Sequence, residues 1–313
     1  MRIAFLDTVH PLLWERLEAR GWTCLDRTTQ SQAALEQESA TWDGIVIRSR
    51  IPMQAAFLDT CAQLKFIARS GAGLENIDLT YCKGRGIAVH SAAEGNRDAV
   101  GEHALGMLLA LWNRLREGDT EMRQGIWRRE ANRGRELSGK TVGILGYGRM
   151  GSAFAQKLAG LGVRIVAHDK FKVGFAEGQV EEVDLDTLQR EADVLSVHID
   201  QRPGNDHFVD AAFLNCFAKP LTVINTGRGK TLDTAGLVSA MKSGKVKGAC
   251  LDVYEYEKRS FEQLNTAELP EAFQYLLNSP KTLLSPHVAG WTTESYVKLS
   301  AVLADKIEAQ FPE

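Results

Sequence analysis

Three glycines between an apolar segment and an amphipathic segment form the chemically clearest pattern in this 313-residue chain. They are Gly146, Gly148 and Gly151, and they follow the apolar, β-branched residues 142–145. In this pattern the first glycine permits a tight turn, the second lets the backbone approach a pyrophosphate, and the third allows a helix to pack closely on a strand. The N-terminus of that helix presents unpaired N–H groups and the positive end of its dipole to phosphates. The segment therefore predicts a bound dinucleotide.

An acidic residue ends the second apolar segment of the same unit. Asp169 lies 23 residues after Gly146, at the end of the strand expected over residues 163–167. A carboxylate at this position accepts hydrogen bonds from the adenosine ribose hydroxyls and repels a 2′-phosphate, which favours NAD over NADP. Lys170 and Lys172 follow, and they either weaken this preference or belong to a solvated loop.

The composition is that of an ordinary globular protein. The chain has 37 basic and 40 acidic residues and a formal net charge of −3, so neither nucleic acid nor an anionic membrane is expected as a principal partner. No apolar run approaches membrane-spanning length and the first residues do not resemble a secretion signal, so we expect a cytoplasmic location. The five cysteines are widely spaced, and they indicate neither a metal site nor a disulfide framework.

Short β-branched runs alternate with helical patterns along the chain, which is typical of parallel sheets covered by helices. The dinucleotide strand falls in the middle of the sequence, so the residues before it form a separate unit. A long apolar helix is expected over residues 100–115, and a final amphipathic helix over 294–309 is suited to packing on the first unit. The expected strands cover residues 2–6, 44–47, 66–68, 87–89, 142–145, 163–167, 194–197, 221–224, 248–253 and 282–284.

Ordered sequence blocks over almost the whole chain resemble the D-isomer-specific 2-hydroxyacid dehydrogenases. The blocks are residues 71–78 (GAGLENID), the glycine turn, residues 224–230 (INTGRGK), and residues 248–257 (GACLDVYEYE) with 285–292 (SPHVAGWT). The resemblance implies an α/β protein of two doubly wound parallel-sheet domains, in which a Rossmann nucleotide domain is inserted into a flavodoxin-like substrate domain. The nucleotide domain would cover residues 99–287, and the discontinuous substrate domain would comprise residues 1–98 and 288–313.

The same resemblance implies three catalytic residues. Arg228 would hold the substrate carboxylate and polarise the carbonyl group, for which a planar guanidinium is suited. His287 would act as general acid and base, because an imidazole titrates near neutral pH and serves both directions of a reaction. Glu257 would orient the His287 ring and favour its protonated form.

The glutamate departs from the usual family pattern in its surroundings. A proline usually follows it, whereas this chain has Lys258, and Glu255 lies two residues earlier as an alternative partner for the histidine. The register counted from Asp252 favours Glu257. The loop that follows is longer than is typical and contains a helix-like stretch at residues 269–277, which either shapes the cleft or caps a surface.

Further cofactor contacts follow from the resemblance. Asp252 would contact the nicotinamide end of the cofactor, and its alternative role is that of a buried carboxylate that caps backbone groups. His198 and Ile199 stand where the family commonly has a proline-containing loop over the cofactor. The expected NAD-binding residues are Gly146, Gly148, Arg149, Met150, Gly151, Asp169, His198, Ile199, Thr226, Gly227, Asp252 and Gly290.

Basic residues indicate the kind of acid that would bind. Arg48 and Arg69 resemble basic positions of the phosphoglycerate dehydrogenase branch, and Arg129 falls where that branch has a residue able to reach a neighbouring subunit's cleft. Converging arginines would suit a second anionic group such as a phosphate, and their alternative role is that of solvated surface charges. Glycines in the adjacent loop let backbone N–H groups approach a carboxylate. The expected substrate-binding residues are Arg48, Arg69, Ser70, Gly71, Ala72, Gly73 and Arg129.

We therefore expect NAD-dependent hydride transfer at C2 of a small D-2-hydroxy or 2-keto acid, with 3-phosphoglycerate as the preferred substrate. Glyoxylate, hydroxypyruvate or another small 2-keto acid is the second expectation. A non-enzymatic NADH-sensing scaffold is a competing class, because the same fold occurs in transcriptional corepressors. The apolar residues 100–112 and the segment bearing Trp127 resemble the family's intersubunit surface, so a homodimer is expected, and the alternative role of these residues is core packing inside one chain.

Overall fold

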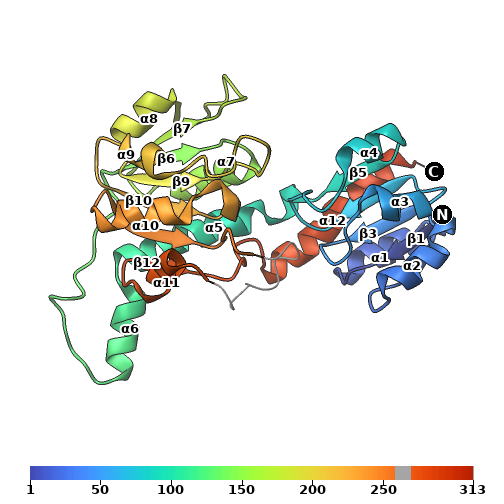
Figure 1. The fold of residues 1–313 in the computed structure, drawn as a ribbon, viewed down its shortest axis with the longest axis horizontal. Coiled ribbons are helices and arrows are strands. Elements are labelled where there is room, and N and C mark those ends of the chain that lie inside the picture. Colours follow the sequence, from blue (N-terminus) through green and yellow to red (C-terminus); the bar gives the residue numbers. More distant parts are fainter. Residues whose placement is uncertain (258–268, 313) are drawn as a thin grey trace. The chain divides into compact units, whose positions relative to one another are not determined.

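Two compact α/β units make up the computed structural model, which describes residues 1–257 and 269–312 (Figure 1). The first unit contains residues 1–97 and 291–312, and the second contains residues 98–257 and 269–290. The sequence predicted the first boundary after residue 98, and the structure has it after residue 97. It predicted the second boundary after residue 287, and the structure has it after residue 290. The first unit is thus built from both ends of the chain.

A five-stranded parallel sheet of order β2-β1-β3-β4-β5 forms the centre of the first unit. This strand order is that of flavodoxin-like domains, in which ligands bind where the order reverses, here beyond the carboxyl ends of β1 and β3. The strands are β1 (Arg2–Phe5), β2 (Thr23–Asp26), β3 (Gly44–Ile47), β4 (Phe66–Arg69) and β5 (Ala88–Ser91).

Helices cover both faces of this sheet, because successive side chains of a strand point to opposite sides. Ile3 and Phe5 pack with α1 (Pro11–Ala19) and α12 (Thr293–Gln310), so the last helix covers the same face as the first (Figure 1). Ala4 packs on the opposite face, which α2 (Gln32–Glu38), η1 (Ser39–Thr41), α3 (Ala55–Thr60) and α4 (Leu79–Gly84) cover.

The long helix α5 (Ala93–Trp112) carries the chain from the first unit into the second. It begins seven residues earlier than the sequence predicted and ends at Trp112, before α6 (Leu115–Arg123). Gly95 in its first turn crosses α12 so closely that an added Cβ would lie 2.7 Å from the backbone nitrogen of Leu299. Glycine is therefore required at this crossing. None of the helices in the described parts of the chain is both long and apolar enough to cross a membrane.

The second unit contains a seven-stranded parallel sheet of order β12-β11-β10-β9-β6-β7-β8. Its strand order reverses between β6 and β9, as in dinucleotide-binding domains of the doubly wound type. The pair of doubly wound domains predicted from the sequence is confirmed. The strands are β6 (Thr141–Leu145), β7 (Arg164–His168), β8 (Val180–Glu182), β9 (Val194–Val197), β10 (Leu221–Asn225), β11 (Val246–Leu251) and β12 (Thr282–Leu284).

Two hydrophobic cores flank this second sheet. Helices α5 and α7 (Arg149–Leu158) pack on one face. The other face is covered by α8 (Leu185–Glu191), α9 (Ala211–Asn215), α10 (Thr234–Lys242) and α11 (Glu271–Asn278), and a short turn, η2 (Gly229–Thr231), follows β10. The stretch predicted to be helix-like at 269–277 is therefore α11, which packs into this core, whereas Lys258 lies outside the described residues.

Two strands, β2 and β8, escaped prediction from the sequence. They have the sequences TCLD and VEE, and neither has a fully buried residue. Each of them is an edge strand, the last strand at one end of its sheet. An edge strand needs no apolar run, so the β-branched pattern that marks central strands is missing there.

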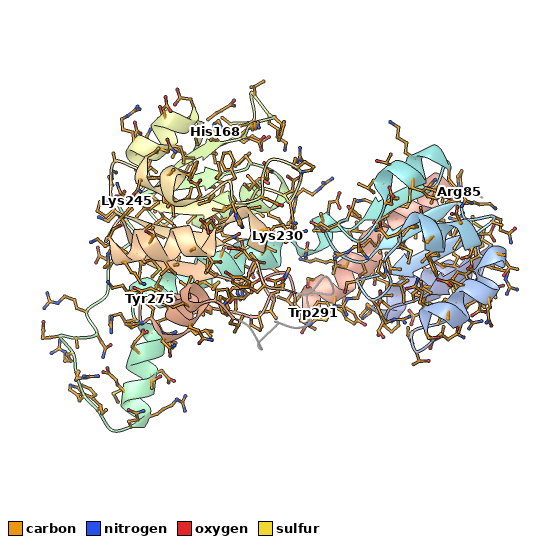
Figure 2. All side chains as sticks on the ribbon, viewed as in Figure 1. Arg85, His168, Lys230, Lys245, Tyr275 and Trp291 are labelled. Atoms are coloured by element: carbon orange, nitrogen blue, oxygen red, sulfur yellow. The ribbon has the colours of Figure 1, made fainter. Side chains whose placement is uncertain are left out.

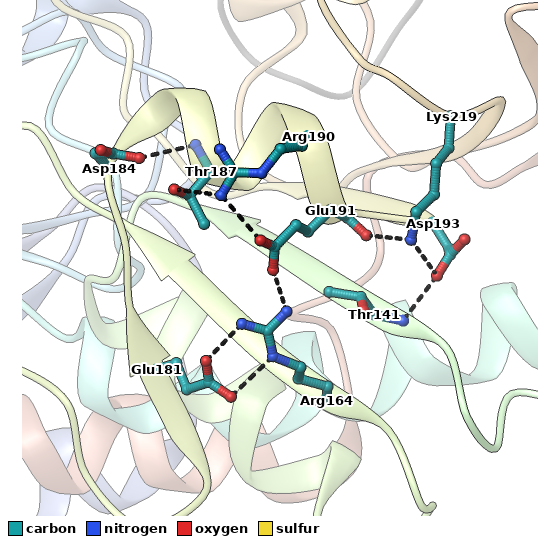
Figure 3. A network of polar contacts seen from close by, with 9 residues as sticks. All are labelled: Thr141, Arg164, Glu181, Asp184, Thr187, Arg190, Glu191, Asp193 and Lys219. Atoms are coloured by element: carbon teal, nitrogen blue, oxygen red, sulfur yellow. Dashed lines mark hydrogen bonds and ion pairs between the residues drawn. The ribbon is translucent and has the colours of Figure 1, made fainter.

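A polar network ties together the amino ends of the second sheet's strands (Figure 3). Arg164, the first residue of β7, pairs with the carboxylates of Glu181 and Glu191. The backbone N–H of Thr141, the first residue of β6, donates to the Asp193 carboxylate at 2.9 Å, directly before β9. These contacts lie at the amino edge of the sheet. They therefore do not involve the side chains at its carboxyl edge, where ligands bind in such sheets.

We expect Gly95→Ala to lower the free energy of unfolding by about 2 kcal/mol, because its Cβ would meet the backbone of α12, which has no rotamer to change. Gly84→Ala in α4 is the matched control, since no atom lies within 4 Å of its added Cβ. The control should be neutral or stabilising by up to about 1 kcal/mol, because alanine favours a helix over glycine. Urea unfolding measures both, and equal stability of the two variants would contradict the close crossing.

Candidate active site

Three neighbouring strands of the second sheet lead into the residues expected to be catalytic. Arg228 follows β10, Glu257 follows β11, and His287 follows β12. These strands are adjacent and parallel, so their carboxyl ends meet at one edge of the sheet. That edge is where ligands bind in open α/β sheets.

The loops after these strands are in direct contact with one another. A Cβ added at Gly229 would overlap the Tyr254 carbonyl, so the loop after β10 lies against the backbone of the loop after β11. The Tyr254 hydroxyl lies 2.9 Å from the carbonyl oxygens of both Leu251 and Ser285, which joins the loop after β12. Burial raises the pKa of this phenol, so it stays protonated and can donate. The structure thus brings the three candidate residues to one edge of the sheet.

His287 and Glu257 form a close pair. Glu257 Oε2 lies 2.6 Å from His287 Nδ1, and Glu257 Oε1 accepts a hydrogen bond of 2.6 Å from the Tyr254 backbone N–H. The Glu257 side chain is 9% exposed and the His287 side chain 26%. A carboxylate on Nδ1 makes that nitrogen the donor, so the acceptor nitrogen of the neutral ring is Nε2.

Glu255, the alternative partner, contacts other groups. Its Oε2 lies 3.1 Å from His207 Nε2, and its Oε1 accepts a 2.5 Å hydrogen bond from the Thr234 backbone at the start of α10. The structure therefore pairs Glu257, rather than Glu255, with His287.

The backbone around His287 is held by Asp252. His287 has φ +55°, a conformation that costs a non-glycine residue about 1–3 kcal/mol. Its N–H donates to the Asp252 carbonyl at 2.8 Å, and the Asp252 carboxylate accepts from Val288 N at 2.9 Å and Ala289 N at 2.8 Å. The carboxylate thus caps backbone groups, which was the alternative role for Asp252, and its contact with nicotinamide stays a prediction.

Arg228 is fixed by a turn that Asn225 organises. The Asn225 side chain accepts from Gly227 N at 3.0 Å and donates to the Arg228 carbonyl at 3.1 Å. Thr231 Oγ1 also donates to this carbonyl, at 2.7 Å. The Arg228 backbone therefore has a defined place at the exit of β10, and its Nη1 donates to the Gly227 carbonyl at 2.8 Å.

The glycine turn has the form that a pyrophosphate requires. Gly146 has φ +92°, and a Cβ added at Gly151 would overlap the Gly146 carbonyl, so the turn and the start of α7 are in close contact. No atom lies within 4 Å of an added Cβ at Gly148, the N-cap residue, which has no side chain to cap the helix. Open space therefore lies next to N–H groups at the N-terminus of α7, which fits a phosphate.

Asp169 is fixed next to this turn by backbone donors. Its Oδ2 accepts from Tyr147 N at 2.8 Å, and its Oδ1 accepts from Phe171 N at 2.9 Å and Lys172 N at 3.1 Å. The Lys172 ammonium donates to the Tyr147 carbonyl at 3.0 Å, so it binds to the turn itself. The carboxylate expected to face the ribose is thereby held at the end of β7.

The end of β9 lies next to the same turn, at the reversal of strand order. An added Cβ at Gly146 would lie 2.9 Å from the His198 carbonyl. The His198 ring itself is buried, with Nε2 2.8 Å from Ser196 Oγ and its centroid 5.6 Å from that of Phe154, and burial lowers its pKa to about 4. His198 Nδ1 is buried and has no hydrogen-bond partner among the described residues, and a contact of His198 with the cofactor stays a prediction.

Thr226 supplies a separate indication of a ligand. Its Oγ1 is buried and has no hydrogen-bond partner within residues 1–257 and 269–312. Buried polar groups in native proteins are nearly always satisfied, so an orphaned hydroxyl on this edge fits a bound cofactor.

The candidate substrate residues of the first unit follow β3 and β4. The Arg48 backbone N–H donates to Asp7 at 2.6 Å, and the Arg48 guanidinium carbon lies 4.2 Å from the centroid of the Trp291 ring. Figure 2 labels Trp291, which directly precedes the N-cap residue of α12. The Arg69 guanidinium occupies the space that a Cβ at Gly71 would need. These contacts place both arginines in defined conformations within the first unit.

Arg129 lies elsewhere, in an exposed segment of the second unit. It belongs to residues 124–136, which follow α6 and extend away from the rest of that unit together with α6 (Figure 1). Trp127 in the same segment is 73% exposed. Among the described residues of the unit, the Trp127 indole therefore does not pack into a hydrophobic core.

Comparison with known proteins identifies the family. Residues 105–289 match the profile described as D-isomer specific 2-hydroxyacid dehydrogenase, NAD binding domain. The chain belongs to the D-isomer-specific 2-hydroxyacid dehydrogenases. A D-3-phosphoglycerate dehydrogenase of Archaeoglobus fulgidus is 32% identical over 98% of this chain, which spans 56% of that relative's length.

Other members of this dehydrogenase family are similar to a comparable degree. A hydroxypyruvate reductase of Thermotoga maritima is 32% identical over 85% of this chain and 83% of its own length. The crystal structure of an NADPH-dependent glyoxylate/hydroxypyruvate reductase of Sinorhizobium meliloti, in complex with citrate, is 28% identical with a TM-score of 0.82. That likeness covers 99% of this chain and 95% of the reductase chain.

Three residues that contact candidate site residues or their loops were not singled out in the sequence analysis, namely Asn225 and Tyr254 in the second unit and Trp291 in the first. Asn225 could have been noticed because Asn-Thr-Gly is typical of side-chain-capped turns. Tyr254 and Trp291 gave no such signal, because Ser285 and Arg48, which they contact, lie 31 and 243 residues away in the sequence. Only the folded chain brings the Trp291 ring to Arg48.

We expect Glu257→Gln to lower kcat/KM for a 2-keto acid about 100-fold, because the amide keeps the shape of the side chain but loses the charge next to the His287 ring. Glu255→Gln is the matched control, two residues away, and should change kcat/KM less than about threefold, since it contacts His207 and Thr234 instead. NADH oxidation followed by absorbance measures both variants. The pairing is wrong if Glu255→Gln proves the more damaging change.

Proposed function

We propose that the protein is an NAD-dependent dehydrogenase that interconverts a small D-2-hydroxy acid and its 2-keto acid. The observation that carries the proposal is the 2.6 Å contact of His287 with Glu257, on the same sheet edge as Arg228 and the dinucleotide turn. An acid-base group and a carboxylate-binding group next to a dinucleotide site are the parts that this reaction requires.

Each of the chain's own residues has a defined task in this proposal. Arg228 binds the substrate carboxylate with its planar fork and polarises the 2-keto group. His287, oriented by Glu257 through Nδ1, takes the hydroxyl proton at Nε2 during oxidation and returns it during reduction. A nicotinamide dinucleotide, when bound, supplies the chemistry of accepting or donating the hydride at C2.

The proposed cofactor is NAD. The N-terminus of α7 would bind the pyrophosphate and Asp169 the ribose hydroxyls, with Thr226 Oγ1 as a further polar contact. The preference for NAD over NADP rests on the Asp169 carboxylate, whereas Lys172 donates to the Tyr147 carbonyl and so places a positive charge on the same turn.

The proposed substrate carries a second anionic group, and 3-phosphoglycerate is the preferred candidate. Arg48 and Arg69 of the first unit support this choice, since guanidinium groups suit phosphate, and a 32% identical relative is a D-3-phosphoglycerate dehydrogenase. Hydroxypyruvate or glyoxylate is the second candidate, supported by the Thermotoga maritima and Sinorhizobium meliloti reductases.

Two further proposals concern the state in which the protein works. Exposed apolar side chains at Met122, Ile126 and Trp127 support a homodimer in which these three residues lie in the interface.

The close pairing of His287 with Glu257 supports an enzyme over an NADH-sensing scaffold, because such a scaffold has no need of an oriented acid-base group.

His287→Ala should lower turnover at neutral pH by a factor of about 100 or more, because the proton would lose its donor and acceptor. NADH affinity should stay within about threefold, since the proposed cofactor contacts lie on other residues. Absorbance at 340 nm measures turnover against a panel of 2-keto acids, and NADH fluorescence measures binding. Near-normal turnover in this variant would refute the assigned role of His287.

Arg48→Gln and Arg69→Gln should each lower kcat/KM for the doubly anionic substrate about 30-fold, because each removes a charge-assisted contact. Activity with glyoxylate, which has no second anionic group, should change little and serves as the internal control. The measurement is the ratio of the two kcat/KM values in each variant. An equal fall for both substrates would show that the arginines do not select the second group.

A further inference from the structure

A chain of hydrogen bonds runs from α5 to the loop that carries His287. His103 Nε2, on α5, lies 2.9 Å from Ser285 Oγ, and Ser285 Oγ lies 2.5 Å from Asp252 Oδ1. The Asp252 carboxylate accepts the backbone N–H groups that follow His287. We propose that His103 is a positioning residue for the acid-base histidine, acting through Ser285 and Asp252. This inference rests on the proposed function.

The chemistry of the three groups determines which of them donates in each hydrogen bond. A carboxylate accepts hydrogen bonds and donates none, so the single hydroxyl hydrogen of Ser285 points to Asp252. The contact between His103 and Ser285 then requires Nε2 to carry the hydrogen and donate to Ser285 Oγ. In this arrangement His103 donates to the Ser285 oxygen while the Ser285 hydroxyl donates to Asp252.

The hydroxyl needs such a donor because it rotates freely on its own. Met107 Sδ lies 3.7 Å from Ser285 Oγ and is a competing, weaker acceptor. A donor at His103 occupies a lone pair of the serine oxygen and keeps its hydrogen directed at the carboxylate. Without His103, the hydroxyl is released to turn toward the sulfur.

Asp252 passes this constraint to the histidine. Its side chain is 1% exposed, and its Oδ1 lies 3.6 Å from His103 Nε2. A carboxylate that loses one donor shifts its two oxygens relative to the N–H groups of Val288 and Ala289. Those N–H groups flank the strained backbone of His287, so a small shift there moves the ring relative to its substrate.

The hydrogen bond between His103 and Ser285 also joins two segments of the second unit that lead to the first, namely α5 and residues 285–290. His103 is near the start of the part of α5 that belongs to the second unit, and Ser285 opens the segment that ends at residue 290. The His103 imidazole, which is 27% exposed, is thereby given a role in the site. Its proposed role is to hold the acid-base loop to α5.

The test compares His103→Ala with His103→Gln, because a glutamine amide can donate to Ser285 in place of the imidazole. We expect the alanine variant to lose about tenfold in kcat with unchanged affinity for NADH, and the glutamine variant to stay within about threefold of the parent chain. In the Ser285→Ala background, His103→Ala should cost no further activity, since its path to Asp252 is already broken. Additive losses in the double variant, or equal losses for alanine and glutamine, would overturn the proposal.

A measurement that does not depend on turnover separates this inference from the proposed function. Ring signals in NMR spectra of the histidine-labelled protein, assigned with His287→Gln, should shift for His287 in the His103→Ala variant. They should not shift for His287 in His90→Ala, the matched control, because His90 pairs with Gln310 in the first unit. An unmoved His287 signal in His103→Ala overturns the positioning role, whereas a parent chain inactive on every 2-keto acid overturns the proposed function alone.

Discussion

The geometry of the candidate site depends on one buried carboxylate. Asp252 accepts hydrogen bonds from Ser285, Val288 and Ala289, and a buried charge of this kind costs several kcal/mol unless such donors satisfy it. The φ of +55° at His287 has its own cost, of about 1–3 kcal/mol. The hydrogen bonds from Val288 and Ala289 to the carboxylate offset both costs, because they satisfy the buried charge and hold the strained turn in place. The position of the acid-base ring follows from this balance.

The parallel sheet makes such an arrangement possible. Asp252 follows β11 and His287 follows β12, and these strands are hydrogen-bonded neighbours in the sheet. Residues 35 positions apart in the chain are thus brought together by backbone pairing rather than by a flexible loop. Glu257 and Arg228 join the same edge from β11 and β10, so a rigid scaffold fixes all the proposed catalytic groups.

Local sequence patterns predicted those features that a single continuous segment forms. The glycine turn is one such feature, because the strand, the turn and the helix N-terminus are all encoded within residues 141–158. The family resemblance added Arg228, Glu257 and His287, but only the folded chain shows why Glu257 and not Glu255 reaches the ring. Both glutamates have the same chemistry, and the turn after β11 decides which of them points toward His287.

Contacts between distant segments were outside the reach of sequence patterns. His103 and Ser285 are 182 residues apart, and Arg48 and Trp291 come from the two separate chain segments that build the first unit. A histidine in an apolar helix and a tryptophan before a helix carry no periodic signal of a partner. Such pairs follow from tertiary packing, which no single segment encodes.

The proposed division of tasks between the two units would account for relatives whose names refer to different acids. The proposed proton-transfer residues and all their supports lie in the second unit, whereas the arginines proposed to select the substrate lie in the first. The hydrogen bonds described for the loop that carries His287 are made with groups of the second unit. Under the proposed roles, substitutions in the first unit would change the preferred acid and leave the proton-transfer residues in place. Relatives of equal identity, 32%, whose names refer to phosphoglycerate and to hydroxypyruvate are consistent with this separation.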